Sequence, residues 1–169
     1  MSQEPIVNRV ANSPLINLDL TKMLPQFTVI HLDLAQFLDQ GLVLREQHFR
    51  NKLKFLDRKT FKGSYVRIYC STEAIIPAWT NTLIAAHLAN EVKKIVTASP
   101  SEFELILWMD HIAEMNLDSF RDRLVLIKGC GEGEVPPSAQ TFLVQRLTKI
   151  VKKLMFGEAC SFVPLYKSK

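Results

Sequence analysis

The chain has 169 residues, of which 47% are hydrophobic and 22% are charged, and its formal net charge is +4. These values are ordinary for a globular protein and exclude extensive disorder, because enough apolar surface is available to form a core. The Lys and Arg residues are scattered and do not form a basic stripe, so we expect no nucleic-acid binding.

Hydropathy also argues against a membrane location. The most apolar run, residues 74–89, is short and is interrupted by Pro77 and by several polar residues. The N-terminal residues lack a basic region followed by an apolar core, so we expect no signal peptide.

The chain has three cysteines, and an odd number favours thiols or metal ligands over disulfides. We therefore expect a cytoplasmic protein.

The first third of the chain predicts two strands and a helix. Residues 15–20 (LINLDL) alternate between apolar and polar, and residues 27–33 (FTVIHLD) are rich in β-branched side chains. Residues 34–40 predict one or two helical turns that end at Gly41. An amphipathic helix is predicted over residues 44–57.

From Ser64 onward, predicted strands and helices alternate. The strands are predicted over residues 65–70, 92–98 and 124–127, and the helices over residues 77–90, 100–116 and 137–156. Ser99 is a predicted N-cap, with Glu102 reaching back to it. Arg67 stands inside the first of these strands, although a strand buried on both faces rarely holds an unpaired charge.

This alternation predicts the fold class. A β-α-β-α-β-α order over residues 64–156 gives parallel strands joined by right-handed crossovers. We therefore predict a single layered α/β domain over residues 1–169, with a mostly parallel sheet to which the N-terminal strands and helix are added. The tail from Cys160 is expected to add a short edge strand.

The three cysteines lie in similar stretches: SYVRIYCSTEAIIP at 64–77, LVLIKGCGEGEVPP at 124–137, and GEACSFVP at 157–164. Cys70 and Cys130 follow predicted parallel strands, whose carboxyl ends share one edge of a sheet where ligands commonly bind. Cys160 follows the last predicted helix, so we expect it at the opposite edge unless the tail doubles back.

Three functions fit this pattern. The first is a metal or small-ligand site, and for zinc the candidate ligands are Cys70, Cys130, Cys160, His48 and Glu73, although no CxxC pair is present. The second is a thiol-dependent enzyme using Cys130 or Cys70, with Glu132 or Glu73 as proton acceptor. The third is an interaction module with inert, buried cysteines.

Several strings together resemble a bacterial family, domain of unknown function 2480. They are IVNRVANS from Ile6, GLVLRE from Gly41, the stretch from Tyr69 to Trp79, IKGC ending at Cys130, and GEACSFVPLYK from Gly157. The resemblance covers nearly the whole chain and implies a small cytoplasmic bacterial protein, but no reaction, cofactor or catalytic residue. A homodimer is expected only because small cytosolic domains commonly pair symmetrically.

Overall fold

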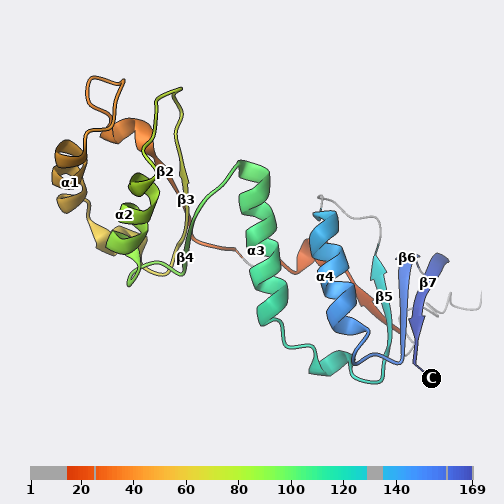
Figure 1. The fold of residues 1–169 in the computed structure, drawn as a ribbon. Coiled ribbons are helices and arrows are strands. Elements are labelled where there is room, and N and C mark those ends of the chain that lie inside the picture. Colours follow the sequence, from red (N-terminus) through yellow and green to blue (C-terminus); the bar gives the residue numbers. More distant parts are fainter. Residues whose placement is uncertain (1–14, 25, 129–134, 159, 169) are drawn as a thin grey trace, which may run out of the picture. The chain divides into compact units, whose positions relative to one another are not determined.

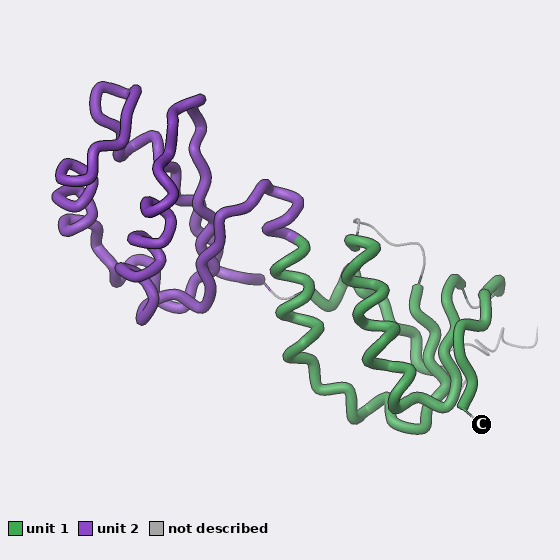
Figure 2. The backbone as a smooth tube through the Cα atoms, in the orientation of Figure 1, with its two compact units in different colours: residues 1–25, 105–169 green, residues 26–104 purple. Residues whose placement is uncertain are grey.

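The computed structural model describes residues 15–24, 26–128, 135–158 and 160–168. They fall into two compact units (Figure 2). Unit 2 is the continuous segment Gln26–Glu104, and unit 1 is formed by the described residues on either side of it. No helix in the described ranges is long and apolar enough to cross a membrane.

Unit 2 is built on a three-stranded parallel sheet. Its strands are β2 (Val29–Asp33), β3 (Tyr65–Tyr69) and β4 (Lys94–Thr97), in the order β2-β3-β4. The helices α1 (Glu46–Lys54) and α2 (Trp79–Leu88) lie on the same side of these strands (Figure 1). Two short 3-10 helices, Leu34–Phe37 and Arg58–Phe61, complete the unit.

The alternation of side chains along the strands gives this sheet two different faces. Leu32, Val66 and Ile68 belong to the core shared with α1 and α2. Their neighbours His31, Arg67 and Tyr69 must then point to the other face, because successive side chains in a strand alternate. Unit 2 thus has an apolar, helix-covered face and a second face, which carries these polar side chains beside the buried Tyr65 and which we call the polar face.

Unit 1 is built on a four-stranded sheet with the order β1-β5-β6-β7. Its strands are β1 (Leu15–Leu18), β5 (Leu124–Lys128), β6 (Lys153–Glu158) and β7 (Ser161–Lys167), and only the β6–β7 pair is antiparallel. The helices are α4 (Pro137–Leu147) and the greater part of α3 (Pro100–Glu114). Trp108, Ile112, Leu143 and Leu147 from these helices pack in one core with Val125 and Leu154.

The prediction of an α/β protein with mostly parallel strands is confirmed, and so is the edge strand in the tail. The parallel strands are divided between two sheets, whereas one sheet was predicted. The predicted cap of α3 is also confirmed, because the Ser99 backbone N–H donates to Glu102 Oε2 (2.8 Å) and the Glu102 N–H donates to Ser99 Oγ (3.3 Å).

The prediction of a last helix over residues 137–156 is wrong in its second half. The helix α4 ends at Leu147, and Lys153–Glu158 is the strand β6. Leu154 and Met155 are both buried, with 0% and 4% exposure. Adjacent buried residues are typical of a strand covered on both faces, and here this pattern was mistaken for the continuation of a helical stripe.

Candidate functional site

Cys70 directly follows β3, at the carboxyl end of the parallel sheet of unit 2, as predicted. Its side chain is half-buried and packs against the core formed with α1 and α2. The thiol is free, and its Sγ lies 3.4 Å from Thr72 Oγ1. The thiol therefore has a polar neighbour in addition to its apolar contacts.

Asp33 joins the ends of two neighbouring strands. It is the last residue of β2, and its Oδ1 accepts hydrogen bonds from the backbone N–H groups of Ala35 (2.9 Å) and Ser71 (3.0 Å). Burial pushes the pKa of this carboxyl upward, but hydrogen bonds from Ser71, Ala35 and Tyr69 outweigh that effect and leave the pKa lowered. The ionised Asp33 thus fixes the segment that follows Cys70.

Arg67 occupies the middle of the central strand β3, on the polar face of the sheet. Its Nε donates to His31 Nδ1 (3.0 Å), and its Nη1 donates to the carbonyl oxygen of Ala98 (3.3 Å). Its guanidinium carbon lies 4.4 Å from the centroid of the Tyr69 ring. Arg67 thereby contacts β2, its own strand and the segment after β4.

These side chains form one connected set, which we call the Arg67 group: His31, Asp33, Arg67 and Tyr69. His31 is the register partner of Arg67, and Asp33 is the register partner of Tyr69. The Arg67 group therefore runs along the polar face to the strand ends, where Asp33 holds Ser71 beside Cys70. The set combines a cation, an anion, an imidazole and a phenol, which are the groups that orient polar ligands in binding sites.

The strand order decides where on unit 2 a ligand could bind. In open α/β sheets, ligands usually bind in the crevice where the strand order reverses. The order β2-β3-β4 is sequential and contains no reversal. The polar face that carries the Arg67 group is therefore a better candidate than a crevice between crossover helices.

Two further predicted residues also belong to unit 2. Glu73 lies in the exposed loop after Cys70. His48 is on α1, and its Nε2 is buried without a hydrogen-bond partner among the described residues. Across the described chain, no group of three or more His, Cys, Asp or Glu side chains is arranged to hold a metal ion.

Cys160 belongs to unit 1 and lies, exposed, in the turn between β6 and β7. The expectation that it follows a helix is wrong, because it follows a strand. That strand is parallel to β5, and Lys128 at the end of β5 pairs with Gly157. Cys160 therefore lies at the carboxyl edge of its sheet, the edge at which β5 ends.

Three residues of the predicted chemistry lie outside the described residues. They are Cys130 and the two acids that follow it, Glu132 and Glu134. The zinc site made of Cys70, Cys130, Cys160, His48 and Glu73 therefore stays a prediction.

Asp19 lies at the same carboxyl edge of the unit 1 sheet. A hydrogen bond from Thr21 and the charges of Lys22 and Lys128 hold the pKa of this carboxyl below its ordinary value, against a smaller opposing effect of burial. Its Oδ2 lies 3.7 Å from Lys22 Nζ and 3.9 Å from Lys128 Nζ. Asp19 is thus already engaged by these partners.

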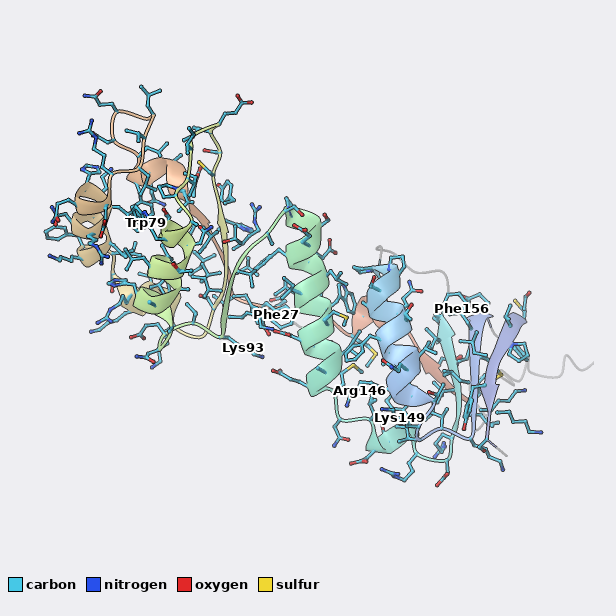
Figure 3. All side chains as sticks on the ribbon, in the orientation of Figure 1. Phe27, Trp79, Lys93, Arg146, Lys149 and Phe156 are labelled. Atoms are coloured by element: carbon cyan, nitrogen blue, oxygen red, sulfur yellow. The ribbon has the colours of Figure 1, made fainter. Side chains whose placement is uncertain are left out.

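Unit 1 also has an apolar hollow of about 320 Å³ beside Phe156, which Figure 3 labels. Its polar lining residues are Gln140 and Thr141. Gln140 donates to the carbonyl oxygen of Val135 (3.1 Å), and Thr141 donates to that of Pro137 (2.9 Å). With these donors engaged locally, the hollow offers mainly apolar contacts.

A second concave surface of unit 1 carries Arg146 and Lys149 (Figure 3). The guanidinium of Arg146 donates from Nη1 to the carbonyl of Ile112 and from Nη2 to that of Met115. These carbonyls lie at and just after the C-terminal end of α3, where the backbone oxygens lack the donors of a further helical turn. Arg146 is therefore a helix-capping residue and not a free cation.

His31 and Asp33 were not among the predicted site residues, and Arg67 was noted only as an unusual charge within a strand. A signal was present, because polar residues recur at alternate positions of VIHLD and YVRIY. Pairing these two strands in register would have placed all four side chains of the Arg67 group on one face.

No curated protein and no solved structure matches the chain. The model of one protein family matches residues 4–168, and its description is "Protein of unknown function (DUF2480)". Because this match covers nearly the whole chain, the protein belongs to the DUF2480 family.

Proposed function

We propose that the protein binds a small polar ligand at the carboxyl end of the unit 2 sheet, next to Cys70. The observation that carries this proposal is the bond from the Ser71 N–H to Asp33 (3.0 Å), which ties the segment after β3 to the end of β2. A fixed loop with polar groups is the kind of structure that orients a small molecule. The two described cysteines are free thiols, which supports action in a reducing compartment such as the cytoplasm.

The test is a fragment screen on the full-length, isotope-labelled protein, read by amide chemical shifts. We expect at least one polar fragment to cause saturable shifts of the Tyr69, Ser71 and Thr72 amides. A screen in which no fragment of any charge perturbs these amides would overturn the proposal.

A matched pair of variants makes this test specific. Asp33 and Asp57 each cap a short 3-10 helix, accepting from Ala35 N (2.9 Å) and Lys59 N (3.0 Å), but only Asp33 also binds Ser71. Loss of either cap costs about 1 kcal/mol of stability. We expect Asp33→Ala to weaken fragment binding and Asp57→Ala to leave it unchanged.

A zinc site is our second proposal, and the position of Cys160 supports it. Cys160 follows β6, and Cys130 comes two residues after Lys128, the end of the neighbouring strand β5. Two thiolates after adjacent parallel strands would supply half of a tetrahedral site. Elemental analysis of untagged protein should then find about one zinc per chain. The zinc should be lost in Cys130→Ser and Cys160→Ser, and metal-free protein would exclude the site.

A further inference from the structure

We propose that Arg67 is the anchor of an oxyanion site on the polar face of the unit 2 sheet, so that the ligand carries a carboxylate or a phosphate. The inference rests on the proposed ligand-binding function and names the chemical class of its ligand. It starts from a positive charge whose contacts within the described residues, His31, Ala98 and Tyr69, are formally uncharged groups.

The charge of Arg67 has no carboxylate partner among the described residues. Its hydrogen bonds go to an imidazole nitrogen and to a backbone carbonyl. Two other arginines of unit 2 are paired with acids, Arg45 with Asp39 and Arg50 with Glu46. Arg67 is a half-buried residue, and partial removal of a charge from water is costly unless the charge is compensated, as a bound anion would do.

Asp33 is the acidic member of the Arg67 group, but its carboxylate is directed elsewhere. Its Oδ1 accepts from two backbone N–H groups, of Ala35 and of Ser71. Hydrogen bonds from Ser71, Ala35 and Tyr69 stabilise the ionised form. Asp33 is thus occupied at the strand end, and its charge is not used to neutralise Arg67.

The guanidinium is also held in place before any ligand arrives. His31, Ala98 and Tyr69 contact it from three sides. Two of its five N–H groups donate to His31 and Ala98, which leaves three N–H groups for another acceptor. A preorganised guanidinium fork binds carboxylate or phosphate with little further loss of conformational entropy.

His31 adds a second donor to the site. Arginine cannot accept a hydrogen bond, so His31 Nδ1 must be the unprotonated nitrogen of its contact with Arg67. The ring proton of neutral His31 is therefore on Nε2. Because the His31 side chain is exposed, this N–H is available beside the guanidinium.

The alternative is that Arg67 only clamps the strands together. A clamp explains the bonds to His31 and Ala98, and its loss would lower stability without any effect on ligands. The two roles differ in their response to anions, and this difference defines the experiment.

The experiment titrates inorganic phosphate, and separately acetate, into the full-length labelled protein at constant ionic strength. We expect saturable shifts of the Arg67 Nε–H and of the His31 ring signals with at least one of the two anions. Saturation by phosphate alone or by acetate alone identifies which oxyanion geometry the site accepts. Shifts that do not saturate, or that chloride reproduces, would overturn the inference.

The matched variants are Arg67→Met, Arg67→Lys and Arg50→Met. Arg50 is an arginine of the same unit whose charge is already paired with Glu46 (2.8 Å). We expect Arg67→Met to weaken anion binding by about tenfold or more, and Arg67→Lys to weaken it less, because lysine keeps the charge but loses the fork. Arg50→Met should have no effect. If Arg67→Met fails to fold, unchanged anion affinity in Arg67→Lys would still contradict the inference.

The fragment screen separates failure of this inference from failure of the proposed function. If neutral or cationic fragments bind at residues 69–72 and are insensitive to Arg67→Met, the ligand site exists but its ligand is not an anion. If no fragment binds there, both proposals fail.

Discussion

At the scale of single residues, His87 shows how burial of a polar group makes stability depend on pH. It is half-buried on α2, and its Nε2 is buried without a hydrogen-bond partner among the described residues. Burial lowers the pKa of His87, and the charge of Arg58 lowers it further. The folded state therefore takes up a proton less readily than the unfolded state, whose histidine pKa is about 6.5.

It follows that His87 opposes folding in acid. Below about pH 6.5 the unfolded chain gains a proton that the folded chain resists, so the free energy of unfolding falls until the lowered pKa is reached. We expect His87→Leu to be neutral or stabilising by up to about 1 kcal/mol at pH 7.5. Chemical denaturation from pH 7.5 to pH 5 should show a shallower loss of stability in the variant.

A second variant identifies the cause. Arg58→Met removes the nearby positive charge but leaves the burial of His87 unchanged, so it should reduce the acid sensitivity only in part. If the free energy of unfolding falls equally steeply with decreasing pH in wild type and His87→Leu, groups other than His87 control the loss of stability in acid.

At the scale of secondary-structure elements, the hairpin of β6 and β7 depends on one glycine. Gly157 has φ +126°, and a Cβ built on it would lie 2.6 Å from the backbone oxygen of Ser161. Gly41 has φ +72°, with no atom within 4 Å of the corresponding Cβ position. A side chain at either position would thus strain the backbone, but only at Gly157 would it also clash with neighbouring atoms.

We therefore expect Gly157→Ala to destabilise the protein by about 3 kcal/mol, from strain and clash together. Gly41→Ala should cost only the strain, about 1–2 kcal/mol. Urea unfolding of both variants measures the difference. Equal losses would mean that the β6–β7 turn relaxes to admit a side chain.

The elements also show what can be predicted from the sequence. The cap at Ser99 and Glu102 was predictable because its two bonds are local. The end of α4 was not, because Val151 and Leu154 fit a helical stripe as well as an apolar strand. Only the pairing of Leu154 with Val125 in the neighbouring strand distinguishes the two.

The candidate site was also predictable only in part, because local features can be predicted from the sequence and strand pairing cannot. The position of Cys70 at a strand end follows from local sequence. The pairing of His31 with Arg67 requires the register between β2 and β3, which are separated by α1 and two 3-10 helices. Contacts of this kind depend on tertiary structure, and composition or spacing does not specify them.

At the scale of the whole molecule, the two units differ in how their sheets are assembled. All three strands of the unit 2 sheet come from one continuous segment. The unit 1 sheet includes β1, whose Leu15 pairs with Leu124 of β5. All of unit 2 lies between these two residues in the sequence. Pairing over such a separation has a high loop-closure cost and cannot be read from local patterns.

This difference predicts how fragments of the chain behave. We expect residues 26–104 to fold alone, because their sheet and the core around Val66 and Ile68 are complete within the fragment. Residues 105–169 should not fold alone, because β5 loses its neighbour β1 and the core loses Leu18 and Leu20. Dispersed amide spectra and cooperative thermal unfolding are the readouts for each fragment. If residues 26–104 instead prove disordered, unit 2 depends on the rest of the chain, and the single domain predicted from the sequence is the correct description.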